Sequence, residues 1–200
     1  MAKKVVGIVG SYRKGHIIDS AVSAVLKGAE QAGARTKKIY LLDKHLEFCT
    51  NCRACTQERD VGRGKCVQED DLEELLKEID SADGIVLGSP INFFTVTAIM
   101  KRFIERLVGS AYWPWGMGAP RLRTKNATKK AVIITSSACP AFIGRILMPN
   151  ALTILKAAAK SLGFKVERKL YFGLAAGEEN QRLEKKALAK AYEAGWMLAS

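Results

Sequence analysis

Residues 4–18 read KVVGIVGSYRKGHII, and this stretch decides the fold. The run from Lys4 to Gly10 is rich in β-branched residues and ends at a glycine, which predicts a buried strand. The turn that follows is basic and flanked by glycines. From Ile17 to Gly33, apolar residues recur at helical spacing and stop at a glycine. A strand, a glycine turn and a helix in this order form the first unit of a sheet covered by helices.

The same alternation continues to the end of the chain. Two irregular segments interrupt it: a cysteine-rich loop at about 43–69 and an excursion at about 109–128. The further strands are expected at 36–42, 84–89, 130–135 and 165–172, and the further helices at 70–82, 97–108, 145–162 and 179–198. This pattern predicts an α/β three-layer sandwich with a parallel sheet and helices on both faces. Five strands predict the flavodoxin-like order 2-1-3-4-5 in a single domain over residues 1–200.

Composition and charge exclude several classes of protein. Hydrophobic residues make up 48% of the 200 residues and charged residues 26%, which is globular rather than disordered composition. No apolar run approaches the roughly 20 residues that span a bilayer, and the N-terminal apolar stretch is too short for a signal peptide, so we expect a cytoplasmic protein. The net charge is +12, and residues 101–200 carry all of the excess. Such a surface attracts phosphates, nucleotides, nucleic acid or acidic proteins, and the charge alone does not indicate which of these is the ligand.

Three loops should form a binding site, because ligands of open α/β sheets bind beyond the carboxyl ends of the strands. The first loop, Gly10–Ile17, combines hydroxyl and cationic donors with a helix N-terminus, which favours a phosphate; a basic solvated turn is the alternative. It matches neither the dinucleotide motif GxGxxG nor the nucleotide motif GxxxxGK[ST]. The second loop, Gly88–Thr95, places a proline turn beside two phenylalanines, which suits a flat ring unless both are core residues. The third loop, Thr135–Pro140, has small polar residues that let the backbone approach a ligand.

Together the three loops resemble the NAD(P)H-dependent FMN reductase branch of the flavodoxin-like superfamily. The family's first loop typically reads GSxRKxxN and its second GSPxYFxxxxxxxKxFxDR, where this chain reads GSYRKGHI and GSPINFFTVTAIMKRFIER. The resemblance implies that the first loop holds the FMN phosphate and that the other two line the isoalloxazine ring. The residues implied at the phosphate are Ser11, Arg13, Lys14, His16, Ile17 and Ile18. Those implied at the ring are Pro90, Ile91, Asn92, Phe93, Ser136 and Ser137.

Four of the five cysteines follow the pattern C-x2-C-x2-C-x10-C, at Cys49, Cys52, Cys55 and Cys66. The repeated spacing turns successive thiolates toward one object, as an iron–sulfur cubane requires. Zinc also accepts four thiolates, although usually as two separate pairs, and a loop of free thiols is the third alternative. Residues 49–75 resemble the cysteine segment of iron–sulfur flavoproteins, which implies that these four cysteines bind a 4Fe–4S cluster. We expect Cys139 to be an ordinary thiol near the flavin.

These features predict a flavoenzyme that passes electrons from NAD(P)H or ferredoxin through FMN to an acceptor. Without a cluster, we expect an NAD(P)H:FMN or quinone-type reductase, with a quinone, azo compound, nitro compound or metal ion as acceptor. A nonenzymatic carrier like flavodoxin is a second hypothesis, although such carriers tend to be acidic. The resemblance further implies a homodimer or homotetramer, in which the excursion with Trp113 and Trp115 covers a neighbouring subunit's flavin.

A nucleic-acid-binding module is a third hypothesis. Basic residues crowd the end of the excursion near Trp113 and Trp115, and basic side chains interleaved with aromatic ones can bind single strands by charge and stacking. The residues concerned are Arg121, Arg123, Lys125, Lys129 and Lys130. A basic lid that attracts the phosphates of NAD(P)H, or one that simply faces water, is the simpler interpretation.

Overall fold

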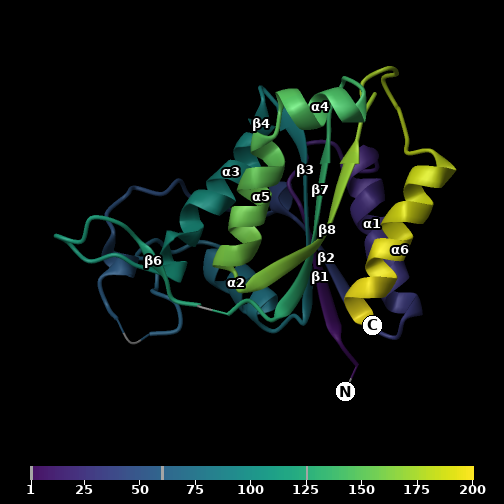
Figure 1. Cartoon of the computed structure of the whole chain (residues 1–200). Coiled ribbons are helices and arrows are strands. Elements are labelled where there is room, and N and C mark those ends of the chain that lie inside the picture. The colour runs from purple at the N-terminus through teal and green to yellow at the C-terminus, as the bar shows by residue number, and fades with distance from the viewer. Residues whose placement is uncertain (1, 60, 125) are drawn as a thin grey trace.

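The structure is a computed structural model that describes residues 2–59, 61–124 and 126–200 (Figure 1). Its central sheet has the predicted order, with parallel strands β2-β1-β3-β7-β8. These strands are β1 (Lys4–Val9), β2 (Arg35–Tyr40), β3 (Gly84–Asn92), β7 (Lys129–Ser136) and β8 (Phe164–Phe172). A sixth strand that was not predicted, β4 (Thr95–Val96), folds back antiparallel on the end of β3. The flavodoxin-like α/β class is therefore confirmed.

Helices cover both faces of the sheet, and each face has its own core. On one face, α1 (Ile17–Gln31) and α6 (Lys185–Ala199) pack on Val5, Val9 and Val86. On the other face lie α2 (Leu72–Asp80), α3 (Ala98–Glu105) and α5 (Asn150–Ser161), which pack on Val6, Ile8 and their neighbours. Residues 5 and 9 therefore face one layer and residues 6 and 8 the other, as the period of a strand requires.

Three predicted helices differ from the structure. The helix expected at 145–162 is two helices, α4 (Ala141–Leu147) and α5, which are bent by 73° at Met148 and Pro149. Proline has no N–H and disfavours helical geometry in the residue before it, so one helix cannot run through this point. The last helix begins at Lys185 rather than at residue 179, because residues 173–184 form a loop. In addition, α3 ends at Glu105 in a 3₁₀ turn, η3 (Arg106–Ser110).

The cysteine-rich loop and the excursion lie against each other at one end of the molecule, to the left in Figure 1. The excursion contains the short hairpin β5 (Ala111–Tyr112) and β6 (Arg121–Leu122). The 3₁₀ turn η1 (Leu41–Asp43) leads into the cysteine-rich loop, which contains a second 3₁₀ turn, η2 (Ala54–Thr56). The Gly64 N–H donates to the Gly109 carbonyl at 2.9 Å. Beside this contact, a Cβ on Gly64 would lie 1.6 Å from the Cys55 carbonyl oxygen, so the close approach requires glycine.

No single helix in the described ranges is long and apolar enough to cross a membrane. The bent pair α4 and α5 meets the test together, by length and composition only.

Helices α1 and α6 cross at two glycines. A Cβ on Gly195 would lie 1.8 Å from the Val25 carbonyl oxygen, and a Cβ on Gly28 would lie 2.0 Å from the Tyr192 carbonyl oxygen. Both contacts are with backbone atoms, which cannot rotate away as a flexible side chain could. The two helices can therefore lie this close together only because glycine has no side chain at positions 28 and 195.

We predict that Gly195→Ala lowers the free energy of unfolding by about 1–3 kcal/mol, because the added methyl group forces α6 away from α1. Urea denaturation measures the change. Ala189→Ser, at an exposed position of α6, is the control and should change stability by less than about 0.5 kcal/mol. Equal stability of the parent and Gly195→Ala would contradict the close helix crossing.

Candidate functional site

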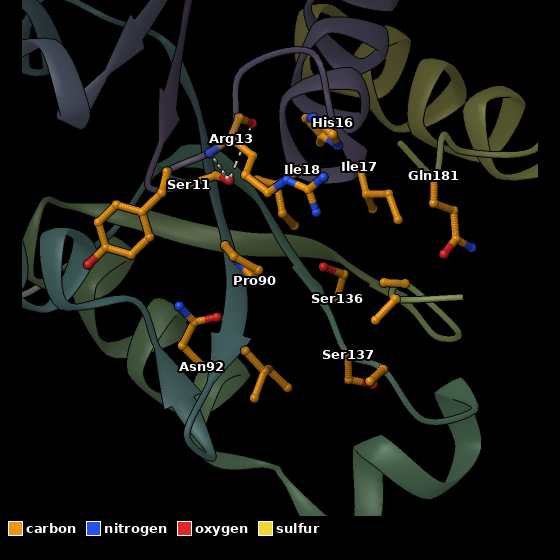
Figure 2. A pocket seen from close by; sticks show the side chains of 15 residues that line it. Ser11, Arg13, His16, Ile17, Ile18, Pro90, Asn92, Ser136, Ser137 and Gln181 are labelled. Carbon is orange, nitrogen blue, oxygen red and sulfur yellow. Dashed lines mark hydrogen bonds between the residues drawn. The ribbon is translucent and has the colours of Figure 1, made fainter. Parts of the chain in front are cut away.

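A cavity of about 290 Å³ lies beyond the carboxyl ends of β1, β3 and β7 (Figure 2). Its volume is near the lower end of the roughly 300–1,000 Å³ usual for small-molecule sites. Figure 2 shows the β1–α1 turn on one side of the cavity, with Pro90 and Asn92 from β3 opposite and Ser136 and Ser137 at a third side. The cavity thus occupies the place at which the strand order reverses, where open α/β sheets bind ligands.

The β1–α1 turn offers unused hydrogen-bond donors. His16 is the N-cap residue of α1, and its side chain makes no capping bond, so side-chain capping does not satisfy the first-turn N–H groups. The Ser11 hydroxyl accepts a bond from the Arg13 N–H at 3.2 Å, which folds the turn back on itself. Gly15 has φ +77°, a left-handed conformation that favours glycine. A helix N-terminus beside a cation is a binding site for an anionic group such as a phosphate.

The side chain of Asp19 holds the β1–α1 turn in place through hydrogen bonds. Its carboxylate is buried and accepts a bond from the Gly15 N–H at 2.5 Å, from Lys38 Nζ at 2.8 Å and from the Tyr40 hydroxyl at 3.0 Å. Burial raises the pKa of the Asp19 carboxyl, but the bonds from Lys38, Gly15 and Tyr40 outweigh it, so the pKa lies below its usual value. Asp19 is therefore ionised at neutral pH and fixes Gly15 relative to β2.

Two buried hydroxyls hold the neighbouring loops together. The Gly10 N–H donates to the Gly88 carbonyl at 2.7 Å, and the Thr97 hydroxyl donates to the Gly10 carbonyl at 2.7 Å. The Ser89 hydroxyl accepts a bond from the Thr97 N–H at 3.1 Å. These bonds connect the ends of β1 and β3 with the start of α3, so two sides of the cavity have a fixed separation.

Ten of the twelve residues predicted for flavin binding line the cavity, and two do not. Lys14 points away from it and forms an ion pair with Asp43 at 2.6 Å. Phe93 is 95% exposed in a left-handed conformation, because the chain reverses there between β3 and β4. Phe94 is also exposed, so the alternative that both phenylalanines are core residues is wrong. The binding roles of the ten lining residues stay predictions.

Five lining residues were missed by the sequence analysis: Tyr12, Ala138, Ala175, Ala176 and Gln181. Three of them belong to the loop at 173–184, of which the part from residue 179 onward was expected to be helical. An Arg13 guanidinium bond to the Glu179 carbonyl closes this loop over the first one. Gly173 and Gly177 were the signals in the sequence that could have indicated a loop. Cys139 lies near the cavity, as expected, with its Sγ 3.4 Å from the Ser137 hydroxyl.

The four clustered cysteines line one small cavity of about 20 Å³, room for about one water molecule. Burial raises the pKa of the Cys55 thiol, and the other three cysteines raise it further. Within the described ranges, no three His, Cys, Asp or Glu side chains are arranged to hold a single metal ion. The donor set suits thiolate-binding metals in number and chemistry, but the gap is too small to admit a cluster unless the loop opens. A second cavity, of about 680 Å³, adjoins Cys55 and Cys66.

Arg106 connects the cysteine-rich loop to the sheet. Its buried guanidinium pairs with the buried Asp70 at 2.6 Å, donates to the Glu47 carbonyl at 2.7 Å and lies 3.4 Å from Cys66 Sγ. Burial raises the pKa of Asp70, but bonds from Arg106 and from the Glu47 and Leu72 N–H groups lower it below its usual value. Both ends of the loop are thus attached to one cation, which also offers positive charge to the Cys66 sulfur.

The aromatic residues of the excursion contact the cysteine-rich loop. The Arg53 guanidinium carbon lies 3.8 Å from the Trp113 ring centroid and 4.3 Å from that of Trp115, and the guanidinium donates to the Trp113 carbonyl. Arg53 itself has φ +59°. These rings therefore pack on Arg53 of the same chain, and the prediction that they cover a neighbouring flavin stays untested.

Three of the basic residues behind the nucleic-acid hypothesis donate hydrogen bonds to backbone carbonyls of the chain itself. Arg123 donates to carbonyls of the cysteine-rich loop, among them that of Glu58 at 2.7 Å. Lys129 donates to the Asp80 carbonyl, and Lys130 to the Met197 carbonyl. Lys125 lies outside the described residues. Three of the four described side chains that suggested a strand-binding surface thus make hydrogen bonds within the chain, and the fourth, Arg121, is exposed.

The sequence profile described as NADPH-dependent FMN reductase matches residues 3–144. The chain belongs to this family. The match covers the β1–α1 turn, the end of β3, the cysteine-rich loop and the end of β7. It confirms the family that the sequence analysis predicted and supports the class of flavin-dependent oxidoreductase.

Two curated proteins that match about half of this chain are named iron-sulfur flavoproteins. An iron-sulfur flavoprotein of Archaeoglobus fulgidus is 36% identical over 111 residues, which are 56% of this chain and 48% of that protein. An iron-sulfur flavoprotein of Methanocaldococcus jannaschii is 40% identical over 103 residues, 52% of this chain and 51% of that protein. The matched stretch thus spans about half the length of these relatives.

Solved structures share the fold over nearly the whole chain. An FMN-dependent NADH-azoreductase from Bacillus anthracis, in complex with FMN, has a TM-score of 0.68 at 15% identity and covers 99% of this chain and 100% of its own. An NAD(P)H:quinone oxidoreductase from Methanothermobacter marburgensis has a TM-score of 0.67 at 18% identity and covers 100% and 98%. At these identities the likeness shows the fold alone.

We predict that Asp19→Asn lowers the free energy of unfolding by about 2–3 kcal/mol at pH 7, because Lys38 loses its buried charged partner. The pKa of Asp19 in the folded protein lies below its ordinary value of 3.8, so its stabilising contribution is present above that value. The contribution is lost as the pH falls through the folded-state pKa. The difference between parent and variant should therefore be constant from about pH 5 to 7 and shrink below about pH 4.

Urea denaturation across this pH range measures the difference. Asp43→Asn removes an exposed ion pair with Lys14 and is the matched control, with an expected change below about 1 kcal/mol. A stability difference for Asp19→Asn that is absent, or that grows on acidification, would contradict the assigned role of this carboxylate.

Proposed function

We propose that the chain is a flavin-dependent oxidoreductase that binds FMN in the cavity at the ends of β1, β3 and β7. The observation that carries this proposal is the pairing of an uncapped α1 N-terminus and Arg13 at one side of the cavity with apolar and small polar residues at the others. A flavin mononucleotide has the same two parts, one anionic group and one flat ring. When bound, FMN accepts two electrons and can release them singly.

The chain's own residues would bind and orient the cofactor. Ser11, Arg13 and the first-turn N–H groups of α1 would hold the phosphate, while Asp19 keeps the turn in place. Pro90 and Ile91 offer an apolar wall for the ring, and backbone and hydroxyl groups at Ser136 and Ser137 offer hydrogen bonds to its polar edge. No protein acid or base is required, because the electron transfer is the cofactor's own chemistry.

The proposed donor is a reduced nicotinamide nucleotide or ferredoxin. The description of the family supports the nucleotide, and a cluster, if the cysteines bind one, would favour a one-electron protein such as ferredoxin. A nonenzymatic carrier is the weaker candidate, because a net charge of +12 does not suit a protein that docks on basic partners. A cluster-free reductase of the quinone type is the alternative if the cysteines bind no metal.

We further propose that Cys49, Cys52, Cys55 and Cys66 bind a 4Fe–4S cluster. Three observations support this: the four side chains line one cavity, Arg106 reaches Cys66, and the curated relatives are named iron-sulfur flavoproteins. A structural zinc is the alternative to a cluster, because zinc also accepts four thiolates.

The flavin proposal predicts that Arg13→Ala weakens FMN binding about ten-fold or more, because it removes a charge-assisted contact to the phosphate. Riboflavin has no phosphate, so its affinity should not change. Titrations followed by flavin fluorescence measure both affinities. Lys14→Ala, which removes an equal charge from the same turn but outside the cavity, should have the smaller effect on FMN. Equal affinity of the parent for riboflavin and FMN would exclude this turn as the phosphate site.

The cluster proposal predicts that alanine at any one of the four cysteines lowers the iron content of anaerobically purified protein, since a cubane needs four ligands. The fifth cysteine provides the control, because Cys139→Ala should leave the iron content and the visible spectrum unchanged. FMN should stay bound in all five variants, as none of these cysteines lines the flavin cavity. Parent protein with stoichiometric zinc, or with no metal, would refute the cluster and leave the flavin proposal intact.

A further inference from the structure

The positive charge of the second half of the chain is not used by the site described above. Residues 126–200 contain twelve basic and five acidic residues. Of these basic side chains, Lys165 is the one that has an acidic partner within 4.0 Å among the described residues. Part of this unpaired charge gathers where α4, β8 and α6 meet.

Four cations from three elements line one cavity of about 340 Å³ at this place. They are Arg145 on α4, Lys169 on β8, and Lys186 and Lys190 on α6. Glu184 is the one acidic residue among the described residues that line it, and all four cations are exposed. Lys186 and Lys190 stand one helical turn apart, a like-charge spacing that weakens a helix unless an anion lies between them.

The walls of this cavity add two features that suit an organic phosphate. It reaches the first turn of α6, whose N-cap Glu184 makes no side-chain cap bond, so the helix dipole adds to the positive potential. Leu170, Tyr171 and Phe172 of β8 also line it. The Tyr171 hydroxyl is buried and has no hydrogen-bond partner within the described residues. A cation cluster beside apolar and aromatic side chains can hold the phosphates and the ring of one molecule.

Protection of a sheet edge explains only part of this arrangement. Strand β8 is at the edge of the sheet, and charged residues on an edge strand prevent pairing with other chains. That reason covers Lys169, but not the gathering of Arg145, Lys186 and Lys190 from two helices around the same cavity.

We propose that this cavity is a second ligand site, which binds the diphosphate group of a nucleotide on the four cations, with the organic part against Leu170–Phe172. It shares no lining residue with the flavin cavity, so the inference does not rest on the proposed function. The two sites are nevertheless neighbours, because the Phe172 carbonyl accepts a bond from the Ser137 N–H at 2.9 Å.

Isothermal titration calorimetry with ADP tests the proposal. The protein is first saturated with FMN, so that FMN occupies the flavin cavity and ADP cannot bind there. We expect binding, and we expect Lys186→Ala/Lys190→Ala to weaken it at least about ten-fold, since two charged contacts to phosphate are lost. FMN affinity should not change in this variant, which separates a failure here from a failure of the flavin site. Lys156→Ala/Lys160→Ala is the matched control: it removes two exposed lysines with the same spacing from α5, outside the cavity.

Further titrations identify the ligand class. ADP should bind more tightly than AMP and more tightly than inorganic pyrophosphate, and pyrophosphate should compete with ADP. Absence of ADP binding would overturn the proposal. An equal loss of ADP affinity in the two double variants would also overturn it, because the lysines would then act only through the overall positive charge. Equal affinity for pyrophosphate and ADP would contradict the nucleotide assignment, because the adenosine would then contribute nothing to binding. Binding of a DNA duplex without binding of ADP would assign the surface to nucleic acid instead.

Discussion

Gly10 is fixed on both sides of its backbone, and the flavin cavity depends on this constraint. Its N–H bonds to β3 and its carbonyl accepts the Thr97 hydroxyl at the start of α3. A Cβ at this position would lie 2.6 Å from the Met100 side chain. The end of β1 therefore cannot shift relative to β3, and the turn that follows must leave the sheet in one direction. That direction brings the α1 N-terminus to the cavity, while Asp19 holds the far side of the same turn.

The cysteine-rich loop depends on a different kind of interaction. Three arginines, Arg53, Arg106 and Arg123, bind its backbone carbonyls or stack on the excursion that packs against it. An irregular loop leaves many carbonyls without partners, and a guanidinium can donate several hydrogen bonds at once. Arg106 and Arg123, which lie outside the loop in the sequence, thus supply hydrogen bonds to loop carbonyls that regular structure would otherwise satisfy, while Arg53 joins the loop to the excursion. Arg106 also places positive charge 3.4 Å from the Cys66 sulfur, which becomes anionic when deprotonated.

The order of the strands and most of the residues that line the cavity could be predicted from the sequence, because both follow from local sequence patterns. The three central strands β1, β3 and β7 contain short apolar runs rich in β-branched residues, and the residues that follow them must meet at one edge of a parallel sheet. The misplaced residues depend on tertiary detail. Lys14 turns outward to Asp43, and Phe93 lies at a chain reversal that no periodicity predicts. The start of the last helix was placed six residues too early, because local composition at 179–184 does not exclude a helix and the Arg13 bond to the Glu179 carbonyl is a tertiary contact. The arginine contacts join residues up to 68 positions apart, beyond the reach of any local pattern.

The central claim is that one cavity holds the two parts of FMN at separate sets of residues, and amide chemical shifts of the ¹⁵N-labelled protein test it most directly. Addition of FMN should shift the amides of Ser11–Ile18 as well as those at 91–92 and 136–137, and leave those of Glu47–Val67 in place. Riboflavin should shift the second and third groups but not the first, because it lacks the phosphate. Equal shifts of Ser11–Ile18 with both ligands, or shifts confined to the cysteine-rich loop, would contradict the account.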